Sequence, residues 1–316
     1  MDLSPVSALQ IMTRNLATTT PNVHVLNAVD KLIAQRVSGL PVVTETHVLI
    51  GRFTEQSAIA ALDLAGLSDK PSSLNSRSCL NLLIAADVMK PPSLVLHSHS
   101  DVMSCTDQLI RKGVSGAPVM ASDGTVLGVF SEKSAMQVFI RLCWEQSPCA
   151  AVTAWMDDEP GRMINEQTTL PEILERFHQT SFRRLLVTRQ GRLIGEITRR
   201  DALSAAVTAI RTPLVESQDR ADMNGLAYKA TVSFWMQHEV PVVSPALNVL
   251  SIAQNFIESS VRQLPVVDDG SLLGQISRSD LLRAVQRFFP VPQPAAARPQ
   301  PLYLSAVAPG REFVTT

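Results

Sequence analysis

The sequence lacks the features that mark several large classes of protein. No apolar run approaches the roughly twenty residues that a membrane-spanning helix requires, and the first ten residues, MDLSPVSALQ, contain neither a basic leader nor a hydrophobic stretch. We therefore expect a cytoplasmic protein without a membrane segment. Charge is nearly balanced, with 28 basic and 29 acidic residues, so no overall electropositive surface is expected to attract nucleic acid.

The sequence also has few of the groups that build catalytic or metal centres. It contains no GxSxG nucleophile turn and no GxxxxGK phosphate loop. His97 and His99 alternate along a predicted strand but have no third ligand nearby. The cysteines lack the paired spacing of zinc sites; they are Cys79, Cys105, Cys143 and Cys149. We predict neither an enzyme nor a metal-binding protein, and no cofactor is required.

What the sequence does contain is a heptapeptide that begins with glycine and occurs four times. A short hydrophobic run precedes each copy, and a methionine stands at the start of each unit. The copies are GRFTEQS at Gly51, GVFSEKS at Gly128, GEITRRD at Gly195 and GQISRSD at Gly274. The methionines are Met12, Met89, Met156 and Met236. This recurrence predicts an array of four related units.

The same order of elements can be followed through every unit. After the methionine comes an extended segment, and then a helix with apolar residues spaced by three and four, as in Val25, Val29 and Leu32. Turns such as Asp123-Gly124 and Asp269-Gly270 then join two strands into a hairpin. A second helix follows the heptapeptide. Each unit therefore reads as β-α-β-β-α.

Two residue types allow finer predictions about the hairpin. Proline cannot donate to a strand ladder, so Pro41, Pro118 and Pro265 are expected at a strand start or at a sheet edge. The hydroxyl residue of each heptapeptide stands where a strand meets a helix and is expected to cap that helix. These residues are Thr54, Ser131, Thr198 and Ser277.

The predicted fold is α/β with α+β character. We place the four repeats at residues 5–64, 80–144, 150–210 and 229–289. Residues 290–316 form a tail with five prolines in its first twelve residues, which we expect to be extended or disordered. As an alternative to disorder, Leu302, Tyr303 and Leu304 in this tail could form a segment that docks on a partner or on the second module. Polar segments from Gly66 and from Thr212 to Lys229 are expected to be loops or short added helices.

The recurring pattern resembles the CBS domain, and pairs of such repeats resemble Bateman modules. The resemblance covers the chain from about Ser7 to Phe289. It implies that repeats pack pairwise into two modules and that the clefts between them hold adenosine-containing ligands. Relatives of this kind regulate other proteins, so an unidentified protein partner is implied. The four repeats either close into a disc within one chain or form a homo-oligomer, such as a dimer in which two chains meet face to face.

The resemblance also implies which residues would bind the ligand. The nucleotide signature of the family is a glycine, then a hydroxyl residue for the phosphates, and an aspartate three positions later for the ribose. The second half matches it at Thr198 with Asp201 and at Ser277 with Asp280, whereas Ser57 and Ser134 replace the acid in the first half. Alignment places Met163 and Val242 at the adenine pocket.

The chemistry of these residue types favours the same half of the chain. A carboxylate accepts hydrogen bonds from ribose hydroxyls, and the amides at a helix N-terminus favour phosphate. Arginine offers a planar fork for phosphate oxygens. The candidate phosphate-binding arginines are Arg183, Arg184, Arg199, Arg200, Arg262 and Arg278.

A hydroxyl followed by an acid three residues later is equally a helix capping box, which needs no ligand. From spacing alone both interpretations stand. With the arginines and the resemblance, we predict a regulatory protein that binds AMP, ADP or ATP in its second module and signals by a change of shape or assembly. The alternatives are a ligand-free scaffold that recruits a partner, or a sensor of S-adenosylmethionine, NAD or a cyclic dinucleotide.

Overall fold

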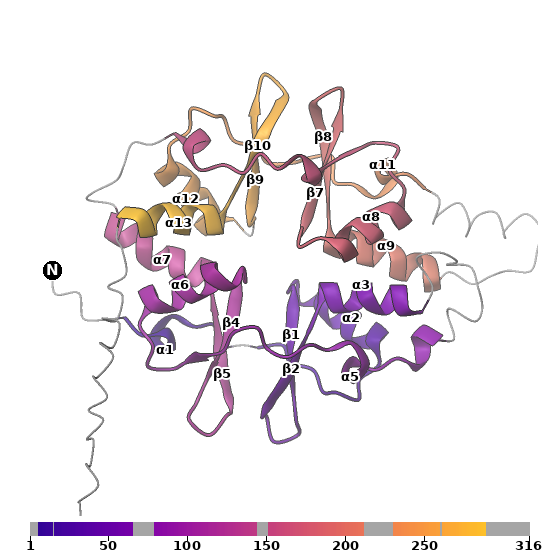
Figure 1. Ribbon diagram of the computed structural model, residues 1–316, viewed down its shortest axis with the longest axis vertical. Coiled ribbons are helices and arrows are strands. Elements are labelled where there is room, and N and C mark those ends of the chain that lie inside the picture. The colour runs from indigo at the N-terminus through magenta and orange to yellow at the C-terminus, as the bar shows by residue number, and fades with distance from the viewer. Residues whose placement is uncertain are drawn as a thin grey trace, which may run out of the picture.

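The computed structural model describes residues 6–14, 16–65, 79–143, 151–211, 230–259 and 261–288. These residues form four copies of one α/β unit arranged around a common centre (Figure 1). Repeats 1 and 2 lie side by side as module one, and repeats 3 and 4 as module two. The predicted pairwise architecture of four β-α-β-β-α repeats is confirmed.

Module one contains a two-stranded and a three-stranded sheet. In each repeat the first helix precedes the hairpin in sequence, and the second helix follows the hairpin. Repeat 1 consists of α2 (Val25–Ala34), β1 (Gly39–Val43), β2 (Leu49–Thr54) and α3 (Glu55–Leu64). Repeat 2 consists of β3 (Leu96–His97), α6 (Val102–Lys112), β4 (Gly116–Met120), β5 (Val126–Ser131) and α7 (Glu132–Cys143). Short helices α1 (Ala8–Ile11) and α5 (Ala85–Val88) lead into the two repeats.

In module two the two hairpins join into one five-stranded sheet with the order β6-β7-β8-β10-β9. Repeat 3 consists of β6 (Met163–Asn165), α8 (Leu170–Gln179), β7 (Arg184–Arg189), β8 (Arg192–Thr198) and α9 (Arg199–Arg211). Repeat 4 consists of α12 (Val249–Glu258), β9 (Gln263–Asp268), β10 (Ser271–Ser277) and α13 (Arg278–Phe288). The short helix α11 (Val232–Trp235) leads into repeat 4, and two 3-10 turns, η1 (Val152–Ala154) and η2 (Pro160–Arg162), lead into repeat 3.

Local sequence chemistry accounts for these elements. The apolar face of each first helix is buried, as Ile173, Leu174 and Phe177 show in α8. The hairpin turns take the left-handed backbone that Gly and Asp tolerate, with φ of 45° at Asp269 and 82° at Gly270. Predicted helices and turns are confirmed here.

The four predicted hydroxyl caps are also confirmed. The Oγ1 of Thr54 accepts a hydrogen bond from the backbone N–H of Ser57 at 3.1 Å. The equivalent bond joins Ser131 to Ser134 at 3.2 Å. In module two, Thr198 and Ser277 accept from the backbone N–H of the aspartate three residues later, each at 3.2 Å.

The prediction for the prolines is confirmed at Pro41, in β1 of the two-stranded sheet, and at Pro265, in the edge strand β9, but it is wrong at Pro118. Pro118 is the third residue of β4, the middle strand of its sheet. It is paired with Val129, whose own N–H and C=O bond Thr13 instead. Because both backbone groups of Val129 point away from β4, the residue opposite it has no N–H bond to make with β5. Proline at this position therefore removes no hydrogen bond between β4 and β5.

The methionine at the head of each repeat packs into the other repeat of the same module. Met12, which precedes repeat 1, belongs to the core that contains Leu96 and Phe130 of repeat 2. A Cβ added to Gly128 would stand 2.6 Å from the sulfur of Met12 and 2.8 Å from the carbonyl oxygen of Thr13. The same pairing recurs at Gly51 with Met89, Gly195 with Met236 and Gly274 with Met156. The segment that begins with the methionine of one repeat thus lies against the other repeat, and we call it the exchanged segment. Its close approach leaves no room for a side chain, so the heptapeptide must begin with glycine.

The hydrophobic cores run across the modules. One core joins Leu32 and Phe53 of repeat 1 to Phe177 and Leu203 of repeat 3. The other joins repeat 2 to repeat 4. Helix α3 packs against α8 and α9, and α7 packs against α12 and α13, so the ring of four repeats closes within a single chain (Figure 1).

Some expectations fall outside the described residues. They concern the loops from Gly66 and from Thr212 to Lys229, and the tail at 290–316 with Leu302, Tyr303 and Leu304. Among the helices of the described ranges, none has both the length and the apolar character to cross a bilayer.

The glycine and methionine pairing predicts the effect of adding one methyl group. Gly128→Ala should lower the free energy of unfolding by about 1 to 3 kcal/mol, the usual range for overpacking, because a backbone oxygen lies in the way. Gly51→Ala should cost less, since its nearest backbone atom, the oxygen of Lys90, lies at 3.3 Å and the flexible Met89 sulfur at 2.9 Å. Urea unfolding of both variants tests this order; equal losses would contradict it.

Candidate functional site

The first candidate site lies where β8 ends and α9 begins. The carboxylate of Asp201 accepts hydrogen bonds from the backbone N–H of Thr198 at 2.9 Å and from its hydroxyl at 2.6 Å. The side-chain amide of Gln237 donates to both carboxylate oxygens at 3.2 and 3.1 Å. Asp201 thus forms a helix capping box and is held by a residue from the segment that leads into repeat 4.

The second candidate site lies at the equivalent corner between β10 and α13. Asp280, which is 7% exposed, accepts from the backbone N–H of Ser277 at 2.8 Å and from its hydroxyl. Its other oxygen accepts from Arg283 at 2.7 Å. Arg283 is 57% exposed, whereas the side chain of Asp280 is buried. A ligand hydroxyl that reaches this oxygen would take the place of the arginine.

The two sites differ in the residue that the exchanged segment brings beside them. At repeat 3 this is Gln237, which bonds Glu196 through its backbone. At repeat 4 it is Asp157, which bonds Gln275 in the same way. Sequence reasoning missed both residues, because they reach the site only through the exchange of leading segments.

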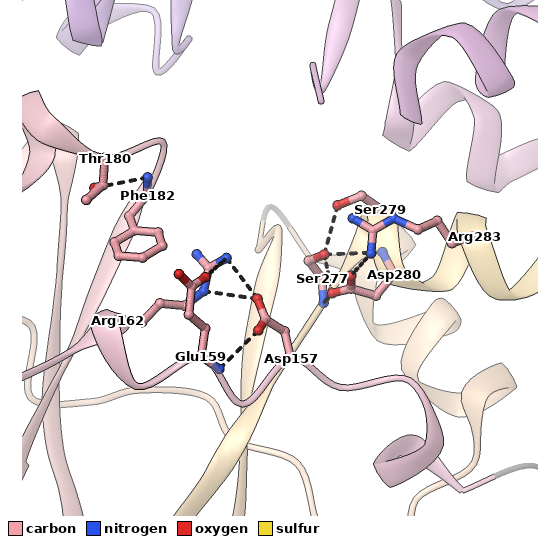
Figure 2. Close-up of polar contacts among 9 residues, drawn as sticks. All are labelled: Asp157, Glu159, Arg162, Thr180, Phe182, Ser277, Ser279, Asp280 and Arg283. Carbon is pink, nitrogen blue, oxygen red and sulfur yellow. Dashed lines mark hydrogen bonds and ion pairs between the residues drawn. The ribbon is translucent and has the colours of Figure 1, made fainter. Parts of the chain in front are cut away.

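Repeat 3 contributes residues on the other side of Asp157 from the second site. Figure 2 shows Arg162 and Phe182 on one side of Asp157, and Ser277 and Asp280 on the other. The guanidinium of Arg162 lies over the Phe182 ring at 4.5 Å. Arg162 also forms an ion pair with Asp157 at 2.8 Å. The sequence motif gave no signal for this arginine and aromatic pair.

Two of the predicted arginines bind the ends of neighbouring helices. Arg199 donates to the carbonyl of Thr180 at 2.8 Å, at the C-terminus of α8. Arg278 donates to the carbonyl of Phe256 at 2.8 Å, near the C-terminus of α12. A cation suits a helix C-terminus. Burial is the main cause that lowers the pKa of Arg199 and of Arg278 to about 10 each. A neighbouring charge is the next cause, that of Arg183 for Arg199 and that of Arg262 for Arg278. Both arginines therefore stay charged at neutral pH.

Module one binds the same helix ends. Gln56 of α3 donates to the carbonyls of His178 and Thr180 at 3.3 and 3.4 Å. Lys133, its equivalent on α7, donates to the carbonyl of Ser259 at 3.4 Å. The C-termini of α8 and α12 are therefore contacts between the modules.

Three more predicted arginines reach from module two into module one. Arg183 donates to the hydroxyl of Ser115 at 2.6 Å, and Arg262 donates to that of Ser38 at 3.2 Å. Arg200 lies 3.2 Å from the carboxylate of Glu55. These contacts bring the arginines of both repeats toward the centre of the ring.

The sixth predicted arginine is engaged elsewhere. Arg184 forms an ion pair with Glu196 at 2.7 Å, and both side chains are buried. Burial lowers the pKa of Arg184, while Glu196 and Asp201 raise it. Removing one partner of a buried ion pair is costly, so this arginine is poorly placed to exchange Glu196 for a ligand phosphate.

The predicted adenine-pocket residues lie on the extended segments of repeats 3 and 4. Met163 begins β6, which runs parallel to β7, and Met163 itself pairs with Leu186 of β7. Val242 precedes Val243, which bridges Val266 of β9. Val242 is 48% exposed. An apolar side chain with this exposure is available to contact a ligand.

Two glutamates of module one, which sequence reasoning missed, face the arginines. Glu55 and Glu132 occupy the first positions of α3 and α7, where α9 and α13 begin with Arg199 and Arg278. Burial raises the pKa of Glu55, against the charges of four arginines of which Arg200 acts most strongly. The fifth residue of the heptapeptide is glutamate in both copies of module one and arginine in both copies of module two. Comparing the four copies by charge at this position could have revealed the opposite charges.

The environment of Glu132 predicts a change of stability with pH. Burial raises its pKa above 4.5, Arg183, Arg262 and Arg278 oppose that shift, and Asp280 adds to it. Because the folded state then binds the proton more tightly than the unfolded state, wild type loses stability as pH rises through the folded pKa.

Glu132→Gln cannot lose a proton. Its free energy of unfolding relative to wild type should therefore rise as pH increases from 4.5 to 7. Urea unfolding across this range measures the difference, with the exposed Glu45→Gln as the control. A difference between Glu132→Gln and wild type that stays flat or falls would contradict the raised pKa.

Comparison with known proteins agrees with this architecture. A sequence relative, the uncharacterized protein MJ1225 of Methanocaldococcus jannaschii, is 21% identical over 285 residues, covering 85% of this chain and 95% of that protein. The crystal structure of MJ1225, proposed to be an archaeal homologue of γ-AMPK, superposes with a TM-score of 0.73 at 17% identity and covers 88% of this chain and 99% of that one.

An uncharacterized protein from Pyrococcus horikoshii superposes with a TM-score of 0.54 at 17% identity, covering 89% of this chain and 100% of that chain. The sequence model of the CBS domain matches residues 6–64, 85–141, 154–208 and 232–287. These four matches span most of the chain and coincide with the four repeats of the fold. The chain belongs to the CBS-domain family.

Proposed function

We propose that the protein is a regulatory sensor that binds an adenosine-containing nucleotide, of the AMP, ADP or ATP type, in module two. The observation that carries the proposal is the convergence of two groups at each corner of that module. A carboxylate lies at the start of a helix, and arginines lie beside it, where module one has serines and glutamates. CBS repeats lend themselves to such a role because paired repeats form clefts.

The carboxylates support the ribose part of the proposal. Asp280 lies on the other side of Asp157 from Arg162 and Phe182 of repeat 3 (Figure 2). Within the described residues, it accepts a hydrogen bond from the exposed Arg283 in addition to those of its own capping box. A ribose has two adjacent hydroxyls, which could take the place of that guanidinium while the capping bonds remain.

The arginines support the phosphate part. Arg183, Arg200 and Arg262 lie near one another, where their charges act on Glu55. Buried Nε groups of Arg199, Arg200 and Arg278 have no hydrogen-bond partner within the described residues. Buried donors without partners are costly, and phosphate oxygens would satisfy them. Arg200, whose Nε is one of these donors and which also lies at the centre, is therefore the strongest candidate for a phosphate ligand, and Arg184, paired with Glu196, is the weakest.

The signal follows from the position of the site between repeats. A ligand that contacts both repeats of module two, and through the arginines also module one, binds one arrangement better than another. This difference in affinity is the free energy available for a change of shape, commonly about 1 to 3 kcal/mol.

The test is calorimetric titration of AMP, ADP, ATP and S-adenosylmethionine into the full chain and into Asp280→Asn. Asparagine still accepts the capping bonds, so the fold should persist while affinity falls by about tenfold or more, as expected for a lost charge-assisted hydrogen bond. Asp201→Asn tests the first site, and the exposed Asp268→Asn is the matched control. Unchanged affinity in both site variants would remove the assignment.

One observation favours a second function, a ligand-free scaffold. Asp201 and Asp280 already have hydrogen-bond partners in the protein, through their capping boxes and through Gln237 and Arg283. A scaffold would show no heat with any of the four ligands and no rise in melting temperature on adding them. Tightest binding of S-adenosylmethionine would instead identify a sensor of that cofactor.

A further inference from the structure

The position that begins the second helix carries opposite charges in the two modules. It is Glu55 and Glu132 in module one, and Arg199 and Arg278 in module two. The position just before the second strand differs in the same sense, with Ser38 and Ser115 against Arg183 and Arg262. Equivalent sites around the ring are therefore acidic or neutral in one module and basic in the other.

These side chains meet at the centre of the ring. The charges that act on Glu55 come from Arg200, Arg262, Arg183 and Arg199. Those that act on Glu132 include Arg183, Arg262 and Arg278. Five arginines from module two thus face two glutamates from module one. Asp280 also acts on Glu132, so the excess is two positive charges.

The glutamates neutralise this excess only in part. Glu55 is 7% exposed and forms an ion pair with Arg200 at 3.2 Å. Arg183 and Arg262 instead donate to neutral serine hydroxyls. Burial, and next the charge of Arg183, lower the pKa of Arg262. Repulsion between arginines remains, and an added anion would relieve it.

From this arrangement we infer that Glu55 and Glu132 are internal counter-anions of the arginine cluster, so that a ligand phosphate competes with module one for the same guanidinium groups. The inference rests on the proposed nucleotide site and adds how that site is regulated. The two acids set the affinity for the charged part of the ligand and leave the affinity for its nucleoside part unchanged. Binding of phosphate then weakens the contact between the modules at the N-termini of α3 and α7.

The test compares three probes on the full chain at pH 8: pyrophosphate, ADP and adenosine. Glu55→Gln should bind pyrophosphate and ADP about threefold tighter or more, the effect of removing one like charge several ångströms away in a high effective dielectric. Adenosine should bind as it does to wild type. Glu55→Gln with Glu132→Gln should show a larger gain for pyrophosphate than either change alone.

Glu45→Gln, at an exposed position of the same module, is the matched control and should leave all three affinities unchanged. Melting temperatures verify that each variant is folded, and Glu132→Gln serves alone if Glu55→Gln is not. The gain should shrink at higher salt, because screening weakens the interaction of charges that water reaches.

The outcomes separate the two claims. Pyrophosphate affinity that stays the same or falls in the glutamine variants would overturn the counter-anion role, since a glutamate that merely orients the arginines would weaken binding when lost. The proposed function fails separately if adenosine does not bind and ADP binds no more tightly than pyrophosphate. If the proposed function fails in this way but the glutamine variants still bind pyrophosphate more tightly than wild type, competition of the glutamates for the arginines would still be supported.

Discussion

The architecture depends on one close approach, that of a leading segment to the heptapeptide glycine of its neighbour. The methionine sulfur and the following carbonyl lie where a side chain would begin, as Met12 and Thr13 do over Gly128. This contact places Gln237 beside Asp201, and Asp157 beside Gln275. The module therefore forms by reciprocal exchange, and each candidate site is completed by a residue from the other repeat.

Much of the fold could be predicted because local chemistry repeats four times. Apolar spacing in α8, the left-handed turn at Asp269 and the cap at Thr198 are all determined within a few residues of chain. Pro118 was misplaced because its tolerance depends on which backbone groups of Val129 face a third segment. Such pairing is a tertiary property that no local pattern contains.

The candidate site was less accessible to sequence reasoning. Thr198, Asp201, Ser277 and Asp280 could be chosen from one motif, and the structure shows them as capping boxes, which the motif allows equally. The arginines could be named but their partners could not. Arg184 is paired with Glu196, and Arg199 caps α8, because these contacts depend on the positions of strands and helices distant in sequence.

The two cores give the chain a folding order that its gene order does not suggest. Phe53 of repeat 1 shares its core with Phe177 of repeat 3, and Phe130 of repeat 2 shares its core with Phe256 of repeat 4. During synthesis neither core can be completed when the first half has left the ribosome. Apolar surface on α3 must wait for the third repeat, and that on α7 for the fourth. Such long-range closure is slow, and chaperones have time to act on the waiting half.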